Sequence, residues 1–152
     1  MVENEYSKKV DNLNDYIEYC ERNGFILDSK INQTRVLYRH SNKTLARITI
    51  NNINNSLKKY LDFKEDKLTN DELISRKESK MIEFTDDEAV YSILDFLGYK
   101  KDNTLERVRY VYKKEDIVFE LDEYIKPNKS CVVSLEGEKD KISKIWEELF
   151  KY

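Results

Sequence analysis

The feature of this sequence that most constrains its fold is a period-two alternation of apolar and polar residues, repeated in segments joined by very short connections. In residues 116–125, for example, Phe119 and Leu121 alternate with Glu120 and Asp122. Successive side chains on a strand point to opposite faces, so this pattern predicts strands with one apolar and one polar row. Eight segments are predicted to be strands: residues 2–10, 31–39, 44–52, 56–64, 72–83, 104–114, 116–125 and 131–138.

Turn residues between these segments predict antiparallel neighbours, because connections of a few residues cannot join parallel strands. The expected turns are residues 41–43, 52–55, 114–116 and 126–129. Three segments instead have helical periodicity, at residues 12–23, 85–97 and 139–151. In the second of these, Thr85 and Glu88 have the spacing of a capping box. The pattern therefore predicts an α+β fold dominated by an antiparallel sheet.

The chain has 152 residues with one proline and three glycines, so it offers no evident linker, and we expect a single domain over residues 1–152. Aromatic residues make up 12% of it, which is more than a disordered chain would carry. No apolar run reaches the roughly 20 residues of a membrane span, and the first ten residues lack the apolar stretch of a signal peptide. We therefore expect a cytoplasmic protein that does not associate with a membrane.

Several classes of function lack their characteristic residues in this sequence. The formal net charge is −3, whereas a general nucleic-acid binder would be basic. The two cysteines lie far apart, and His40 is the only histidine, which argues against a zinc site and a histidine-centred triad. The scattered glycines form neither a P-loop nor a dinucleotide-binding motif. Any phosphate chemistry must therefore depend on side chains.

The polar rows of the predicted strands combine many cations with many carboxylates, and this pattern has two interpretations. In the first, a sheet packs one face on a core and exposes a mixed-charge face to solvent. In the second, the strands close into a barrel with the charged rows inside and the apolar rows outside, beneath the helices. A charged interior needs compensation, which a phosphate with Mg²⁺ or Mn²⁺ would supply to both signs of charge.

A series of short motifs, in order along nearly the whole chain, resembles the CYTH, or triphosphate tunnel metalloenzyme, superfamily. This superfamily includes class IV adenylyl cyclases, thiamine triphosphatases and inorganic triphosphatases. The matching segments are Glu3-x-Glu5, Gln33-Thr34, Leu45-Ala46-Arg47-Ile48-Thr49, Phe63-Lys64, Arg76-Lys77-Glu78, Arg107-Val108-Arg109, Leu121-Asp122 and Leu135-Glu136-Gly137. They are similar to the family's ExExK, QxD, LRIR, TxK, RxExE, KxR, LD and EIEG patterns. The resemblance implies an eight-stranded, closed or nearly closed antiparallel barrel, the triphosphate tunnel, with about three flanking helices.

The resemblance also implies the residues of a site inside that tunnel. Carboxylates would hold Mg²⁺ or Mn²⁺, and the candidates are Glu3, Glu5, Glu78, Asp122 and Glu136. Cations would hold a triphosphate, and the candidates are Arg47, Lys64, Arg76, Arg107 and Arg109, with Lys9 and Lys80 as further candidates. The expected partner is a small molecule containing a triphosphate, such as tripolyphosphate, ATP or a similar nucleotide, and a homodimer is compatible with this interpretation.

Four positions depart from the family patterns. Ser7 replaces the expected lysine, Thr49 the second arginine, Lys80 the last glutamate of RxExE, and Ser134 the first glutamate of EIE. Glu120 and Glu138 lie on the same rows as Asp122 and Glu136 and are candidates to compensate for the lost carboxylates, as Lys9 is for the lysine.

Three functional hypotheses follow from the resemblance and its departures, and a fourth from the alternation alone. The leading one is a divalent-metal-dependent phosphohydrolase acting on inorganic tripolyphosphate or on a nucleoside or thiamine triphosphate. The second is a class IV-type adenylyl cyclase that makes cyclic AMP from ATP. The third is a non-catalytic tunnel that binds a nucleotide or polyphosphate. The fourth is an interaction scaffold with a solvated sheet face. The sequence assigns no general base.

Overall fold

The computed structural model of the protein describes residues 2–66 and 73–150. It contains nine strands: β1 (Val2–Val10), β2 (Ile26–Arg39), β3 (Thr44–Ile53), β4 (Ser56–Glu65), β5 (Leu73–Lys77), β6 (Ile82–Phe84), β7 (Lys100–Lys114), β8 (Ile117–Lys126) and β9 (Ser130–Glu136). Its three helices are α1 (Asn14–Arg22), α2 (Asp87–Phe96) and α3 (Lys139–Phe150). The predicted α+β class is therefore confirmed, with all nine strands in one antiparallel sheet.

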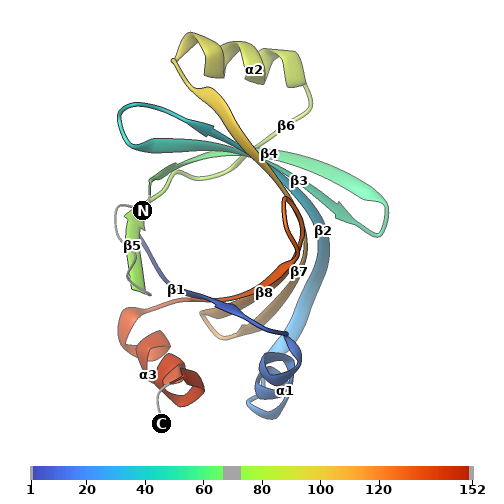
Figure 1. The fold of residues 1–152 in the computed structure, drawn as a ribbon, viewed down its shortest axis with the longest axis vertical. Helices are drawn as coiled ribbons and strands as arrows, with labels where there is room; N and C mark the ends of the chain where they lie inside the picture. Colours follow the sequence, from blue (N-terminus) through green and yellow to red (C-terminus); the bar gives the residue numbers. More distant parts are fainter. Residues whose placement is uncertain (1, 67–72, 151–152) are drawn as a thin grey trace.

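The sheet curves around an open centre without closing into a continuous ladder (Figure 1). The strand order is β5-β1-β9-β8-β7-β2-β3-β4-β6, so β5 and β6 are its two edges. Where the segment after β5 approaches β4, an isolated bridge joins Lys64 and Glu78 and a backbone hydrogen bond runs from Ser79 N to Phe63 O at 2.8 Å. Side-chain oxygens add hydrogen bonds, as from Phe63 N to Ser79 Oγ at 2.9 Å. The expected eight-stranded, closed or nearly closed barrel is therefore not confirmed. The structure is a strongly curved, open nine-stranded sheet.

Most predicted strands lie where the alternation placed them. The structure has nine strands where eight were predicted, because one predicted segment contains two. Residues 72–83, predicted as one strand, contain two short ones: β5 pairs with β1, and β6 pairs with β4 on the far edge of the sheet. One straight strand cannot serve two partners on opposite edges, so the segment breaks between Lys77 and Ile82. β2 and β7 are also longer than predicted, because they pair with each other from Ile26 to Arg39.

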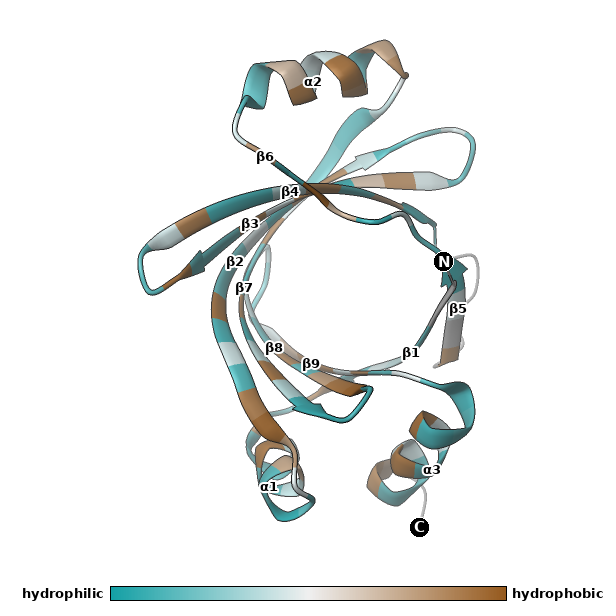
Figure 2. Ribbon diagram, turned by 180° about the vertical axis from the view of Figure 1, so that it is seen from behind, coloured by the Kyte–Doolittle hydropathy of each residue, from teal (hydrophilic) through white to brown (hydrophobic). Residues whose placement is uncertain are grey.

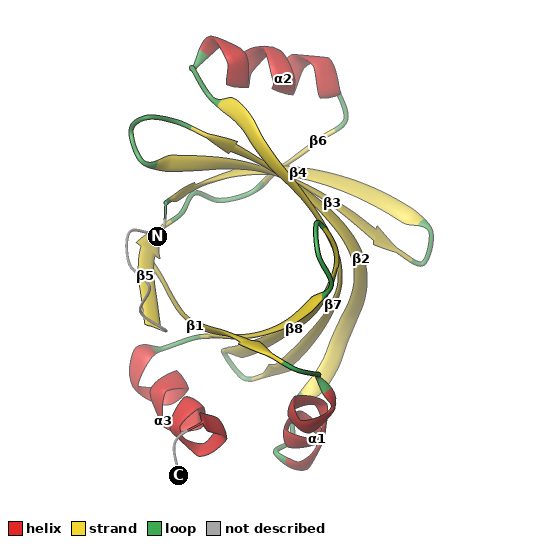
Figure 3. Ribbon diagram, in the orientation of Figure 1, coloured by secondary structure: helices red, strands yellow, loops and turns green. Residues whose placement is uncertain are grey.

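The apolar rows form two separate hydrophobic clusters on the outer side of the sheet. The three helices lie on that outer side (Figures 2 and 3). Beneath α1 and α3, strands β8 and β9 contribute Phe119, Leu121 and Leu135 to a core that includes Trp146 of α3. The second and smaller cluster lies beneath α2, with Ala46, Ile48 and Leu61 of β3 and β4 packed against Val90 and Leu94 of the helix. This packing leaves the inner face of the sheet to the polar rows.

The start of α2 differs by one residue from the capping box that the sequence indicated. The N-cap is Asp86, whose Oδ1 accepts a hydrogen bond from Ala89 N at 3.0 Å. Asp86 is followed by two further acidic residues, Asp87 and Glu88, in the first helical turn. An aspartate at this position satisfies an otherwise unpaired backbone donor as well as threonine does and adds a charge that suits the helix dipole.

None of the helices in the described part of the chain combines the length and the apolar character that crossing a membrane would require.

Candidate functional site

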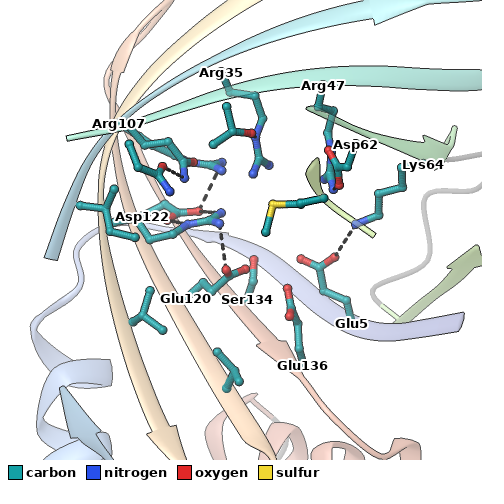
Figure 4. A pocket seen from close by; sticks show the side chains of 18 of the residues that line it. Glu5, Arg35, Arg47, Asp62, Lys64, Arg107, Glu120, Asp122, Ser134 and Glu136 are labelled. Atoms are coloured by element: carbon teal, nitrogen blue, oxygen red, sulfur yellow. Dashed lines mark hydrogen bonds and ion pairs between the residues drawn. The ribbon is translucent and has the colours of Figure 1, made fainter. Parts of the chain in front are cut away.

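The concave face of the sheet lines a cavity of about 850 Å³. Inward side chains of β2, β3, β7 and β8 form most of its wall, and the remaining lining comes from β1, β4, β5, β9 and the segment after β5. Figure 4 shows arginines of β2, β3 and β7 approaching the centre from one side and glutamates of β1, β8 and β9 from the other. The polar rows thus converge on one space instead of covering a flat, solvated face.

Ten of the twelve residues singled out from the sequence line this cavity. They are Glu5, Arg47, Lys64, Arg76, Glu78, Lys80, Arg107, Arg109, Asp122 and Glu136. Lys9 lies on β1 but is exposed and outside the lining. Glu3 also lies on β1, opposite Arg76 of β5, and its side chain lies outside the described part of the structure.

Arg109 is held by two carboxylates at the buried wall formed by β7 and β8. Its Nε and Nη2 donate to the two oxygens of Asp122 at 2.7 and 2.9 Å, and its Nη1 donates to Glu120 at 2.8 Å. Burial opposes the charge on Arg109, but the charges of Glu120 and Asp122 outweigh it and raise the pKa of Arg109. Asp122, expected on the metal side, therefore pairs with a cation through both of its oxygens.

A second ionic cluster lies where β3 and β4 face the start of the chain. Arg47 donates from Nε to Asp62 Oδ1 at 3.0 Å, and its Nη2 is also paired with Asp62. Lys64 Nζ lies 3.6 Å from Glu78 and 3.9 Å from Glu5. Glu78, expected among the metal ligands, thus lies between cations. Asp62 was not predicted as a site residue, although its position on the polar row of residues 56–64 was visible in the sequence.

Arg35 is a buried cavity cation that sequence reasoning missed, and it differs from the predicted cations in its surroundings. Its Nε donates to Thr49 Oγ1 at 3.2 Å, and none of the described carboxylates is within ion-pair distance of it. Burial, and then the positive charges of Arg107, Arg47 and Arg109, lower the pKa of Arg35. A guanidinium crowded by like charges is a place where an anion would be stabilised.

Arg107 lies on β7, which pairs with the strand of Arg35, and one of its N–H donors has no hydrogen-bond partner among the described residues. Its Nε donates to Gln33 Oε1 at 2.7 Å and its Nη1 to the Tyr124 hydroxyl at 2.6 Å. Its Nη2 is buried without a hydrogen-bond partner among the described residues, although Asp122 lies 3.6 Å from Nη1. A buried donor without a partner is costly, and an oxygen acceptor that enters the cavity would satisfy it.

Three glutamates form the acidic side of the same cavity. One carboxylate oxygen each of Glu5, Glu120 and Glu136 lies within 4.8 Å of the others. Burial alone would raise the pKa of Glu120, but the charge of Arg109 and a hydrogen bond shared with Glu136 lower it to about 2. Glu120, offered from the sequence as a compensating carboxylate, belongs to this cluster, whereas Glu138 is exposed.

The cluster has a donor set that suits a hard divalent cation. Mg²⁺ binds oxygen ligands at about 2.0–2.1 Å, so two of its ligand atoms lie at most about 4.2 Å apart. Neighbouring ligand atoms of such an ion lie closer still, at about 3 Å, so the three carboxylates would have to draw together around it. Next to them, Ser7 and Ser134 hydrogen-bond to each other at 3.2 Å, where the family patterns have a lysine and a glutamate. Relative to those patterns, the pair at these two positions is uncharged.

Comparisons with known proteins show resemblance at the level of structure. No protein-family model matches the chain, and no curated protein matches it. The PH1012 protein of Pyrococcus horikoshii matches with a TM-score of 0.73 and 23% identity, over 97% of this chain and 87% of that one. A candidate adenylate cyclase from Vibrio parahaemolyticus matches with a TM-score of 0.61 and 13% identity, over 95% and 82% of the two chains.

A chain of the Schizosaccharomyces pombe Mediator head module also matches, with a TM-score of 0.71 and 11% identity, over 99% of this chain and 96% of that one. At these identities the likenesses establish the fold alone. They are consistent with a CYTH-like fold, as the sequence led us to expect, and they show that one fold occurs in proteins described in very different terms.

Proposed function

We propose that the cavity binds a small molecule containing a triphosphate together with Mg²⁺ or Mn²⁺, and that the protein is a metal-dependent phosphohydrolase. The observation that supports this proposal is the separation of charge in the cavity, with positive groups on one side and negative groups on the other. Arg35, crowded by other arginines, and Arg107, which has an unpartnered N–H, face a cluster of three glutamates across one cavity. A polyphosphate with a divalent cation is a ligand that satisfies both sides at once.

The size and the charge of the cavity support a compact, strongly anionic ligand. A volume of about 850 Å³ is in the range of small-molecule sites. Most of its ionic groups are already paired with each other, as in Arg109 with Asp122 and Arg47 with Asp62. A ligand would therefore gain most by contacting the groups whose charge is least compensated, which places its phosphate oxygens near Arg35 and Arg107.

Glu5, Glu120 and Glu136 would hold the metal ion, through the oxygens that the three residues direct toward one another. When bound, such an ion polarises a phosphoryl group and neutralises charge on its oxygens. Arg109 keeps Glu120 ionised and in position, because the ion pair lowers the pKa of that carboxyl to about 2. Arg35 and Arg107 would bind and orient the phosphate chain, with the charge on their guanidinium groups stabilising the transition state of phosphoryl transfer.

Two alternatives share this binding mode and differ in the product. A class IV-type adenylyl cyclase is favoured by the name of the Vibrio parahaemolyticus neighbour. A non-catalytic tunnel that sequesters a nucleotide or polyphosphate is favoured by the four positions that depart from the family patterns. The uncharged hydrogen-bonded pair of Ser7 and Ser134 is an example, since it lies beside the proposed metal ligands.

Product analysis distinguishes the three. The protein is incubated with Mg²⁺ or Mn²⁺ and either tripolyphosphate or ATP, and orthophosphate, pyrophosphate and cyclic AMP are separated. We expect orthophosphate, and we expect its formation to be lost in Arg107→Ala and unaffected in Lys144→Ala, a substitution on the exposed face of α3. Cyclic AMP with pyrophosphate would identify a cyclase. Binding without products would identify a sequestering protein, and no binding at all would contradict the proposal.

A further inference from the structure

A row of four polar side chains crosses the inner face of the sheet, one from each of the neighbouring strands β3, β2, β7 and β8. Gln33 of β2 lies opposite Asn51 of β3 on one side and opposite Arg107 of β7 on the other. Arg107 in turn lies opposite Tyr124 of β8. All four residues line the cavity. The pairing of the strands therefore places Arg107 between a glutamine and a tyrosine.

Hydrogen bonds connect the members of this row in one direction. Arg107 Nε donates to Gln33 Oε1 at 2.7 Å, and Gln33 Nε2 donates to Asn51 Oδ1 at 2.9 Å. A guanidinium group has donors and no acceptor, so Gln33 must present its oxygen to Arg107 and its amide nitrogen to Asn51. On the other side, Arg107 Nη1 donates to the Tyr124 hydroxyl at 2.6 Å. The remaining nitrogen, Nη2, is buried and has no hydrogen-bond partner in the described part of the chain.

The partners that hold Arg107 are uncharged, whereas those of the next inward arginine are carboxylates. Arg109 lies two residues further along β7 and donates to Asp122 and Glu120. Arg107 has an amide and a phenol, and the centroid of the Tyr124 ring lies 5.4 Å from its guanidinium carbon. Asp122 lies 3.6 Å from Arg107 Nη1, but both of its oxygens already accept hydrogen bonds from Arg109. The charge of Arg107 is therefore less compensated than that of Arg109.

Burial keeps this arrangement in place before any ligand binds. Gln33 and Arg107 are each only 5% exposed, so water cannot readily replace either partner. A flexible arginine loses side-chain entropy when a ligand fixes it, and an arginine that is already held does not add that cost to binding. The row thus prepares one N–H group of a cation for an oxygen anion.

We propose that Gln33 and Tyr124 are positioning residues, which hold Arg107 in place for an entering anion and leave its charge uncompensated. This inference rests on the function proposed for the cavity and identifies the residues that prepare its anion-binding arginine. The uncharged state of residue 33 is the decisive property. A carboxylate there could accept the same hydrogen bond from Arg107 Nε but would also neutralise the guanidinium, so an oxyanion would gain less by binding.

The first test is Gln33→Glu, which keeps the size and the acceptor and adds a charge. Calorimetric titration of the full chain with tripolyphosphate and Mg²⁺ should show binding weakened at least about tenfold. Urea unfolding of the free protein should show no loss of stability, because the new carboxylate pairs with an arginine in a site crowded by arginines. A merely structural role for Gln33 predicts instead that binding and stability change together.

Asn32→Asp is the matched control for this variant. Asn32 is the neighbouring residue on β2, is exposed, and points to the opposite face of the sheet, and the substitution changes the net charge by the same amount. Its tripolyphosphate affinity should equal that of the wild type. Equal affinities of Gln33→Glu and Asn32→Asp would overturn the proposal, and so would a loss of stability in Gln33→Glu that accompanies the loss of binding.

The second test concerns the orientation of Arg107 and includes a measurement without ligand. Tyr124→Phe keeps the ring beside the guanidinium and removes the acceptor, so tripolyphosphate should bind roughly three- to tenfold more weakly. Tyr110→Phe, on the alternate row of β7, is its control and should bind like the wild type. In NMR spectra of the free protein, the Arg107 Nε–H should exchange slowly with water, and faster in Gln33→Leu. Equal exchange in wild type and Gln33→Leu contradicts the positioning role.

The positioning role and the proposed function fail in different ways. A wild-type protein that does not bind tripolyphosphate, with or without Mg²⁺, would show that the proposed function is wrong and that Arg107 is not prepared for such an anion. A wild type that binds tripolyphosphate no more tightly than Gln33→Glu does would leave the proposed function standing and refute the positioning role alone.

Discussion

Arg35 and Arg109 are both arginines of one cavity, yet their surroundings give them opposite energetic roles. Arg109 is neutralised by Asp122 and Glu120, at hydrogen-bond distances of 2.7 to 2.9 Å. Arg35 has a hydroxyl as its hydrogen-bond partner and three arginines nearby, and its pKa is lowered by burial and by their charges. Arg109 is therefore a structural cation of the free protein, whereas under the proposed function the counter-charge of Arg35 would come with the ligand.

Replacing these two arginines should separate binding from folding. Arg35→Gln should weaken tripolyphosphate binding roughly 10- to 100-fold, because it removes a charge-assisted hydrogen bond worth about 1.5–3 kcal/mol. The same substitution should leave the stability of the free protein unchanged or raise it. Arg109→Gln should instead destabilise the free protein by roughly 3–5 kcal/mol, since it leaves buried carboxylates unpaired. Calorimetric titration and urea unfolding measure the two effects. Lower stability of the free Arg35→Gln protein would refute this division of roles.

Because of Glu120, the free energy of unfolding should fall as the pH is lowered into the acidic range. Its pKa is about 2 in the folded protein, against a usual value of about 4.5. The unfolded chain therefore binds more protons between these values, and stability rises with pH across that window. The contribution is complete above about pH 4.5 and disappears as the pH falls to about 2. The free energy of unfolding of Glu120→Gln should be lower than wild type at pH 6 and converge with it near pH 2.

Urea denaturation at a series of pH values gives this comparison directly. Glu147→Gln, on the exposed surface of α3, serves as the control for removing a glutamate. A constant difference between wild type and Glu120→Gln from pH 6 to pH 2 would show that Glu120 is not selectively stabilised in its ionised form.

Among single elements, α2 offers the sharpest comparison of sequence and structure. Thr85 and Glu88 have the spacing of a capping box, but the cap is Asp86, hydrogen-bonded to Ala89 N at 3.0 Å. Asp86→Ala should therefore cost about 0.5–2 kcal/mol of stability, and Thr85→Ala much less. Urea unfolding of the two variants, with hydrogen exchange of the amides in the first turn of α2, measures the difference. A larger effect at Thr85 would favour the capping box that the sequence predicted.

Elements whose neighbours are close in sequence were the ones that the alternation predicted well. The hairpin strands β3 and β4 match their predicted bounds within a residue. β1, Val2–Val10, also matches its predicted segment, although its partners β5 and β9 are distant in sequence. The segment 72–83 failed because its two halves pair with β1 and β4, which lie at different places in the sheet. A local pattern indicates that residues are extended but carries no information about distant pairing partners.

The same limit explains what the sequence predicted of the site. Alternation and the family resemblance placed ten residues on the cavity wall, because the direction of a side chain depends on strand parity. Arg35 was missed because its row also contains Ile31 and Leu37, so its polarity was not evident. Which carboxylate pairs with which arginine, as Asp122 does with Arg109, depends on register between strands that no residue pattern specifies.

For the whole molecule, the cavity connects strands from both halves of the chain, so a ligand should stabilise all of it. A ligand at 100 times its dissociation constant adds about 2.7 kcal/mol to the free energy of unfolding. We expect tripolyphosphate with Mg²⁺ to raise the melting temperature, EDTA to reduce the shift, and Glu5→Gln to reduce the difference between Mg²⁺ and EDTA. Differential scanning calorimetry measures all three. Equal shifts with Mg²⁺ and EDTA would contradict coupling between metal and anion.

The charged inner face also determines how the protein responds to heat. Unfolding raises the heat capacity in proportion to the apolar surface that it exposes, and polar surface lowers it. In this sheet the apolar rows are buried only on the outside, while the inner rows bury charges such as Asp122 and Arg107. The heat capacity change for these 152 residues should therefore be smaller than the roughly 2 kcal/mol/K of an ordinary chain of that length. The stability curve would then be unusually flat, with stability varying little across a wide span of temperature.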